Sequence, residues 1–136
     1  METQATTATL DDVRLAIFRQ HTQLAQLLDE LEAHANAVVA SGGEGVELRH
    51  ALDLVTARFA RHLEYEEAHL SPWVAAVRGE EPLMGDHDHQ RALVRGLLHD
   101  RDVFGDARTL SREALAFIHV VRKDMVDEDR KLRALR

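Results

Sequence analysis

Residues 62–70 read HLEYEEAHL, and residues 124–132 read DMVDEDRKL. The two stretches share an apolar residue, a Glu, a second acid and a Leu at offsets of one, four, five and eight from their first residue. Apolar positions around both stretches recur with the 3.6-residue period of an amphipathic helix. On a helix, residues four apart lie on one face, roughly 6 Å apart along the axis. Each stretch is therefore predicted to present a pair of polar side chains on an otherwise apolar face, His62 with Glu66 and Asp124 with Glu128.

The same period extends over the whole chain and defines four helical segments. Helices are predicted over residues 10–40, 46–77, 84–103 and 109–135. The connections are short compared with the helices, which favours antiparallel neighbours. The predicted fold class is therefore all-α, an antiparallel up-down four-helix bundle. Residues 1–8 are expected to form a flexible N-terminal tail, and residues 9–136 a single bundle domain.

Local signals indicate where these helices begin and end. Thr9, with Asp12 three residues later, is typical of the capping pair at a helix N-terminus. The glycine-rich run 41–45 is a strong helix breaker and ends the first helix. Ser71-Pro72 is expected to kink the second helix or to end its regular part, and Gly105 separates the last two helices.

The composition is that of one soluble domain. The chain has 136 residues, of which 45% are hydrophobic and 30% charged, and its formal net charge is −7. Phosphate binding needs a positive surface, so nucleic acid is not expected as a partner. The absence of Cys excludes disulfides, thiolate zinc sites and iron–sulfur clusters. Neither a membrane-spanning apolar run nor a signal-peptide pattern is present, which indicates a cytoplasmic protein.

Six polar residues lie in phase with the apolar positions of the helices. Burying a charged carboxylate without a partner costs on the order of several kcal/mol, so these residues need a compensating ligand or ion. A pair of metal ions provides it, because bundles build di-iron sites from His and carboxylate side chains on facing helices. The candidate metal ligands are His21, His62, Glu66, His87, Asp124 and Glu128.

An internal repeat supports this choice of residues. Leu or Val residues follow both His21 and His87 at the same offsets. The helices that contain these two histidines therefore match each other, as the two quoted stretches do. The chain is thus interpreted as two helical hairpins. Each hairpin contributes one polar residue from its first helix and a pair spaced by four from its second.

These motifs resemble the hemerythrin-like HHE family. The pattern consists of His21, then HxxxEE over residues 62–67 with Leu-Ser-Pro at 70–72, then Asp-His at 86–87, and a final Glu-acid pair at 128–129. The match runs from about residue 10 to residue 132. The resemblance implies a four-helix bundle with a di-iron centre, linked to oxygen binding, to iron or redox sensing, and to the handling of peroxide or nitric oxide. By position, it implies the ligands His21, His62, Glu66, His87 and Glu128.

The chain departs from the family pattern at two positions. Asp124 stands where the family usually has His, and Arg91 stands where hemerythrins proper carry another His four residues after His87. Both departures argue against reversible oxygen carriage. A competing register would use His119 in place of Asp124, since its spacing matches the last motif of hemerythrins proper. On an ideal helix, however, His119 lies about 140° from Asp124.

Other residues near the motif have simpler interpretations. His69 lies one turn past Glu66, beside the ligands or at the open end of the site. Tyr65 is interpreted first as a packing residue and alternatively as a redox-active or hydrogen-bonding phenol. The histidines that fall off the apolar stripes are expected to be solvated: His34, His50, His89 and His99.

Three functions are compatible with these features. The first is a protein with two non-haem iron ions, oxo- or hydroxo-bridged, that binds, senses or reduces O2, peroxide or NO, with Mn or Zn as alternative metals. The second is a di-iron oxidase or peroxidase acting on an organic substrate. The third is a redox-silent metal-storage or interaction bundle. Whether the protein is an enzyme stays open, and a monomer or small homo-oligomer is expected.

Overall fold

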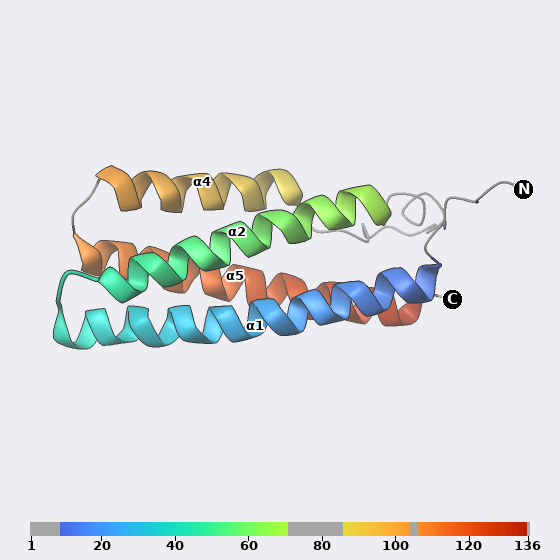
Figure 1. The fold of residues 1–136 in the computed structure, drawn as a ribbon, viewed down its shortest axis with the longest axis horizontal. Coiled ribbons are helices and arrows are strands. Elements are labelled where there is room, and N and C mark those ends of the chain that lie inside the picture. The colour runs from blue at the N-terminus through green and yellow to red at the C-terminus, as the bar shows by residue number, and fades with distance from the viewer. Residues whose placement is uncertain (1–8, 71–85, 104–105, 136) are drawn as a thin grey trace, which may run out of the picture.

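The computed structural model describes residues 9–70, 86–103 and 106–135, and these form four α-helices without β-strands. Consecutive helices run in opposite directions and lie side by side (Figure 1). The predicted all-α four-helix bundle is therefore confirmed. The helices are α1 (Leu10–Ser41), α2 (Val46–His69), α4 (His87–Val103) and α5 (Ala107–Ala134).

The ends of α1 follow the predicted signals. The Thr9 hydroxyl accepts a hydrogen bond from the Asp12 backbone N–H at 3.1 Å, and the Thr9 N–H donates to the Asp12 carboxylate at 3.2 Å. This reciprocal capping box satisfies backbone donors that an open helix end would leave unpaired. At the other end Gly42 has φ 76°, a conformation that favours glycine, and its N–H donates to the Val38 carbonyl at 2.7 Å.

The other helix ends differ from the predictions by a few residues. α5 begins two residues earlier than expected, because the Asp106 carboxylate caps it by accepting from the Arg108 N–H at 3.0 Å. α2 ends at His69. The predictions for Ser71-Pro72, for the second helix up to residue 77, for residues 84–85, for Gly105 and for the tail 1–8 lie outside the described residues.

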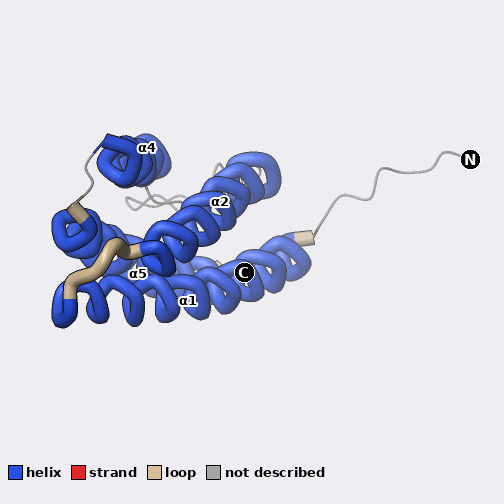
Figure 2. The backbone as a smooth tube through the Cα atoms, turned by 60° about the vertical axis from the view of Figure 1, so that its left-hand side comes forward, coloured by secondary structure: helices blue, strands red, loops and turns tan. Residues whose placement is uncertain are grey.

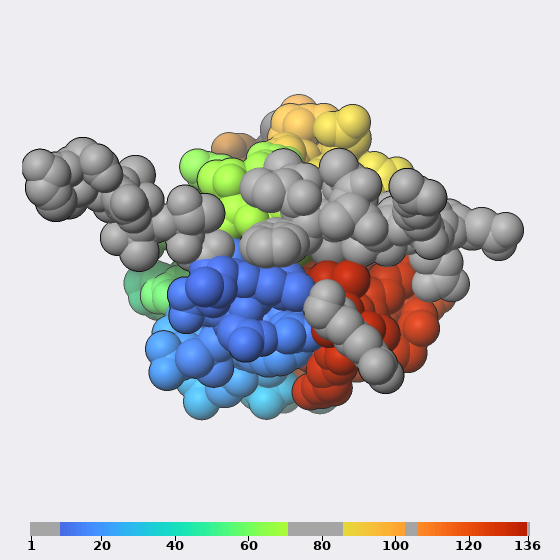
Figure 3. All heavy atoms as spheres, turned by 90° about the vertical axis from the view of Figure 1, so that its right-hand side faces the viewer, coloured from blue at the N-terminus to red at the C-terminus, as the bar shows by residue number. Residues whose placement is uncertain are grey.

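The core consists of two apolar clusters with a polar layer between them. The main cluster fills most of the bundle, from Leu24 to Val38 on α1 and over the facing parts of the other helices. A smaller cluster lies at the end where α1 begins and α5 ends, which Figure 3 shows side by side in blue and red. This end cluster consists of Val13, Ile17, Leu70 and Leu132. Along α1, His21 falls between Ile17 of the end cluster and Leu24 of the main cluster.

Helix α4 stands to one side of the other three helices (Figure 2). Among its described side chains only Gln90 and Leu97 are fully buried. An apolar groove with a volume of about 300 Å³ lies between α4 and α5, lined in part by Leu93, Phe117 and Val120. None of the four described helices combines the length and the apolar character that crossing a bilayer needs.

Candidate metal centre

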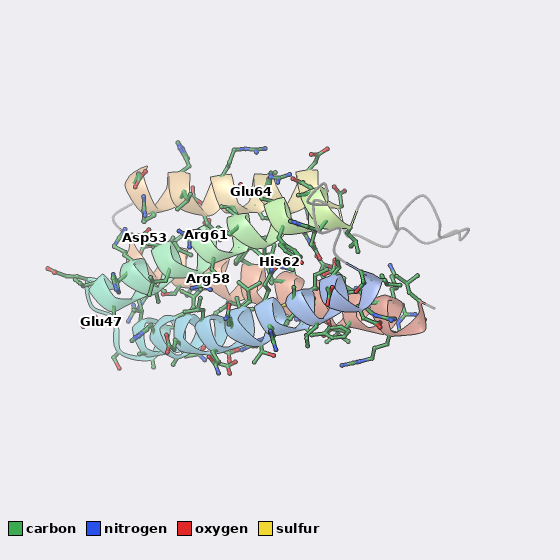
Figure 4. All side chains as sticks on the ribbon, turned by 45° about the vertical axis from the view of Figure 1, so that its right-hand side comes forward. Glu47, Asp53, Arg58, Arg61, His62 and Glu64 are labelled. Atoms are coloured by element: carbon green, nitrogen blue, oxygen red, sulfur yellow. The ribbon has the colours of Figure 1, made fainter. Side chains whose placement is uncertain are left out.

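The polar layer consists of four buried side chains from three helices. His21 of α1, His62 and Glu66 of α2, and Glu128 of α5 are 5%, 4%, 1% and 7% exposed. Each occupies a position in the apolar stripe of its helix, so the packing that buries the stripe also buries the polar side chain. His62 differs in this from the other α2 residues labelled in Figure 4. Those side chains are exposed: Glu47, Asp53, Arg58, Arg61 and Glu64.

The ring nitrogens and carboxylate oxygens of these four residues converge on one point. His21 Nε2 lies 2.9 Å from Glu128 Oε1 and 3.3 Å from His62 Nε2. His62 Nε2 lies 3.4 Å from Glu66 Oε2 and 3.7 Å from Glu128 Oε1. One donor atom from each residue lies within 4.8 Å of all the others. Such a set can surround a single metal ion.

The outer nitrogen of each buried histidine is held by a side chain of a neighbouring helix. His21 Nδ1 donates to Asp129 Oδ1 at 2.7 Å, and His62 Nδ1 donates to Gln20 Oε1 at 2.7 Å. A proton on Nδ1 leaves the Nε2 lone pair of a neutral ring free to bind a metal. Two such lone pairs 3.3 Å apart repel each other unless a proton or a cation lies between them.

His87 of α4 reaches the same cluster from the other side of Glu66. Its Nε2 lies 3.0 Å from Glu66 Oε1, and its Nδ1 donates to Glu67 Oε2 at 2.9 Å. Arg91 donates two hydrogen bonds to the Glu67 carboxylate, at 2.6 and 2.7 Å. Arg91 therefore holds the carboxylate that orients His87.

Asp124 lies beside the four converging residues. Its half-buried carboxylate accepts a hydrogen bond from Gln90 Nε2 at 2.7 Å. Both residues line a cavity of about 20 Å³ that His21, Glu66 and the other members of the cluster also line. This volume holds about one water-sized sphere. The structure thus brings four of the six predicted ligands together, adds His87 through Glu66, and places Asp124 on the wall of the same cavity.

The two histidines beside Glu66 have raised pKa values. Burial lowers the pKa of His62, but hydrogen bonds to Glu128 and Glu66 and the charges of both carboxylates outweigh it and raise the pKa to about 9. Burial of His87 is likewise outweighed by Glu66 and Glu67, so its pKa is raised. In the metal-free protein, the neighbouring carboxylates therefore favour the protonated form of both histidines.

The pKa values of the two buried carboxylates, Glu66 and Glu128, are shifted in opposite directions. Burial alone would raise the pKa of Glu66, but hydrogen bonds from His62 and His87 lower it overall. Burial raises the pKa of Glu128, against the hydrogen bonds from the histidines. One carboxylate thus stays ionised while its partner retains its proton more readily. Outside the cluster, Arg91 and then His87 lower the pKa of Glu67 to about 2.

The chemistry of these residues fits a metal ion. Gln90 Oε1 is buried and has no hydrogen-bond partner among the described residues, and buried Glu66 Oε2 has only the long 3.4 Å contact to His62 Nε2. Such unpaired oxygens are costly in a native core unless a cation or a hydrogen-bond donor binds them. Imidazole nitrogens and carboxylate oxygens, without sulfur, suit iron, manganese or zinc.

The remaining candidates lie outside the cluster. His119 is exposed, so the structure does not support the competing register. His69 is exposed and stacks on Tyr65, with ring centroids 4.2 Å apart, and Tyr65 packs against the end cluster. The histidines expected to be solvated are exposed in three cases, His50, His89 and His99, and partly buried in one, His34.

Four residues of the site were not predicted as functional. Gln20, Glu67 and Asp129 hold the outer nitrogens of the histidines, and each directly follows or precedes a predicted ligand in the chain. That adjacency is a usable signal, because the neighbour of an inward-facing residue lies at the helix–helix boundary. The signal for Gln90 is a polar residue on the apolar stripe, three positions after His87.

The fold and the cluster together define a class of protein, a four-helix bundle with a buried histidine–carboxylate cation site. The chain belongs to the hemerythrin family, since residues 15–135 match the Hemerythrin HHE cation binding domain. This confirms the resemblance seen in the sequence. Comparisons with curated proteins and with solved structures found no match. The family and the buried cluster indicate a metal-binding protein.

Proposed function

We propose that this protein holds two non-haem iron ions between its helices and uses them to bind, sense or reduce a small ligand such as O2, peroxide or NO. The observation that carries the proposal is the setting of the histidines. His21, His62 and His87 each have Nδ1 hydrogen-bonded outward and Nε2 directed at a buried carboxylate. This is the arrangement by which proteins orient imidazole for a metal.

The position of Glu66 supports a pair of ions rather than one. Its Oε1 lies 3.0 Å from His87 Nε2, and its Oε2 lies 3.4 Å from His62 Nε2. The two oxygens of one carboxylate therefore face histidines on opposite sides, as a bridging ligand requires. We assign the bridges to Glu66 and Glu128. The terminal ligands of this proposal are His21, His62, His87 and Asp124.

The size of the cavity supports a small ligand. A volume of about 20 Å³ has room for about one water-sized group, which favours a small ligand over an organic substrate. Bound iron supplies Lewis acidity and redox chemistry at this place. The protein contributes a buried site in which carboxylates favour the higher oxidation state of the metal. Phe59 lines the cavity and stacks on the His62 ring, with ring centroids 6.3 Å apart, and so helps to shield the cavity from water.

Iron loading tests the proposal directly. The purified chain should be loaded with ferrous iron without oxygen, desalted, and analysed for metal and for its optical spectrum before and after exposure to O2, peroxide or NO. We expect about two irons per chain and absorption bands that change with the ligand. A reproducible iron content near zero would rule out the proposal.

A second candidate is a di-iron oxidase or peroxidase acting on an organic substrate, favoured by the groove between α4 and α5. The groove and the cavity share none of their described lining residues. They are close neighbours, because Phe117 of the groove packs edge-on against Phe59 of the cavity, with ring centroids 5.7 Å apart. Turnover of an added organic substrate would support this candidate. Zinc binding without redox activity would instead support a metal-storage or interaction bundle.

We also propose a cytoplasmic setting and a monomer or small homo-oligomer. The absence of Cys and the net charge of −7 support a protein without disulfides and without nucleic acid as a partner. Sedimentation of the iron-loaded chain would measure its oligomeric state.

A further inference from the structure

Gln90 is a buried polar residue that the ligand pattern does not include. It lies on α4, three residues after His87, and is 5% exposed. Its Nε2 donates to Asp124 Oδ2 at 2.7 Å. This hydrogen bond fixes the orientation of the carboxamide, since exchanging its oxygen and nitrogen would place a carbonyl oxygen against a carboxylate. Its Oε1 is thereby left as a buried acceptor without a partner among the described residues.

The unpaired oxygen of Gln90 belongs to the metal cavity. Gln90 lines that cavity together with Glu66, whose buried Oε2 has only the long 3.4 Å contact to His62 Nε2 among the described residues. Both atoms carry lone pairs and face surroundings rich in other acceptors. An amine or hydroxyl donor to Asp124 would not need this second, unpaired oxygen, whose burial is costly. A glutamine here is explained if a cation binds its oxygen.

We propose that Gln90 is a ligand of the metal centre. Its Oε1 supplies an oxygen donor to an ion that Glu66 also binds, and its Nε2 keeps the Asp124 carboxylate in position on the wall of the same cavity. This inference rests on the proposed metal centre and extends it. It assigns oxygen donors to the half of the centre where Asp124 and Arg91 replace the family's histidines, and such donors favour hard ions, ferric iron or Mn²⁺.

The test compares three variants by titration of ferrous iron without oxygen, with the thermal stability of the metal-free protein as a second measurement. Gln90→Leu removes both polar atoms, and Gln90→Glu keeps an oxygen at the Oε1 position. Gln26→Leu, an exposed glutamine on α1, is the matched control. Circular dichroism of each variant checks that the bundle is intact.

We expect Gln90→Leu to weaken one of the two irons, here termed the second iron, at least about tenfold while the other keeps its wild-type affinity. The metal-free Gln90→Leu variant should melt near the wild-type temperature, because removal of the unpaired oxygen offsets loss of the hydrogen bond to Asp124. Gln90→Glu should bind the second iron at least as tightly as the wild type. The control should match the wild type in both measurements.

Three outcomes overturn the assignment. If Gln90→Leu retains two tightly bound irons, Gln90 is a packing residue. If Gln90→Glu loses the second iron as completely as Gln90→Leu does, only the amide contact to Asp124 matters. If the metal-free Gln90→Leu variant is unfolded, Gln90 is structural. Absence of iron from the wild type is a different result, because it rejects the proposed metal centre itself.

Discussion

The two nitrogens of each buried histidine have separate tasks in this bundle. Nε2 faces the cluster, while Nδ1 is held by a residue of another helix, as Gln20 of α1 holds His62 of α2. Asp129 of α5 holds His21 of α1 in the same way. The orientation of each ring therefore depends on how neighbouring helices are packed, and the site is set by the bundle as a whole.

Removing one of these outer contacts should weaken metal binding without removing a ligand. We expect Asp129→Ala to lower iron affinity about 10- to 100-fold, because His21 loses the acceptor that fixes its ring. Competition with a chelator of known affinity measures the change. Asp127→Ala, two residues earlier on α5 and partly exposed, is the control. Equal affinities for the two variants would show that the Asp129 contact has no part in binding.

The residues of the cluster differ in how far they could be predicted. His21, His62, Glu66 and Glu128 were predictable because each is a polar residue at a position where its own helix needs an apolar one. The contacts of Gln20 and Asp129 were not, because they depend on the rotation of one helix against another, which the period of a single helix does not contain. Arg91 was visible as a departure from the family, but its pairing with Glu67 required the structure.

At the scale of the elements, α4 has the fewest buried residues of the four described helices, and Gly96 lies within it. A Cβ placed at Gly96 meets no atom within 4 Å. Gly96→Ala should stabilise the metal-free protein by about 0.5–1 kcal/mol, because alanine is the better helix former and no contact is disturbed. Thermal or urea unfolding measures this.

Gly45→Ala provides the contrast. Gly45 has φ +74° at the start of α2, and a Cβ there would lie 3.0 Å from the Cβ of Ala107. This variant should be destabilised by about 1 kcal/mol or more, because alanine is strained at positive φ. If Gly96→Ala also lowered stability, the space around Gly96 would be tighter than described.

Asp100 and Glu113, which both line the groove, make the stability of the α4–α5 contact depend on pH. The hydrogen bond to Asp100, partial burial and the charge of Asp100 raise the pKa of Glu113 from 4.5 to about 6. Glu113 therefore keeps its proton up to a higher pH in the folded protein than in the unfolded chain. This contribution to stability is lost as the pH rises from about 4.5 to 6.

Glu113→Gln should therefore stabilise the metal-free protein at pH 7 and leave it unchanged at pH 4, where Glu113 is protonated in both folded and unfolded states. The gain should be at most about 1 kcal/mol, since water screens a largely accessible pair. Melting curves of the wild type and the variant at both pH values, recorded with a chelator, measure the difference. An equal effect at both pH values would exclude carboxylate repulsion as its cause.

At the scale of the whole molecule, a metal bound in the polar layer should stabilise the folded state, because it binds the native chain and not the unfolded one. A metal concentration about 1,000 times the dissociation constant adds roughly 4 kcal/mol. Removing the metal should lower the melting temperature accordingly. His62→Ala and Glu66→Ala should respond to iron far less than the wild type. His99→Ala and His34→Ala should respond as the wild type does, and loss of their response would contradict the assignment of the ligands.

The polar layer divides the metal-free molecule into two parts of unequal local stability. The end cluster of Val13, Ile17, Leu70 and Leu132 is small, and in the described part of the chain the polar layer lies between it and the main cluster. Without the metal, this end should open locally while the main cluster stays closed. Amide hydrogen exchange should therefore be faster around Val13 and Leu132 in the metal-free protein, with little change around Leu28. Whether the centre holds metal would then determine whether one end of the bundle is ordered or locally open.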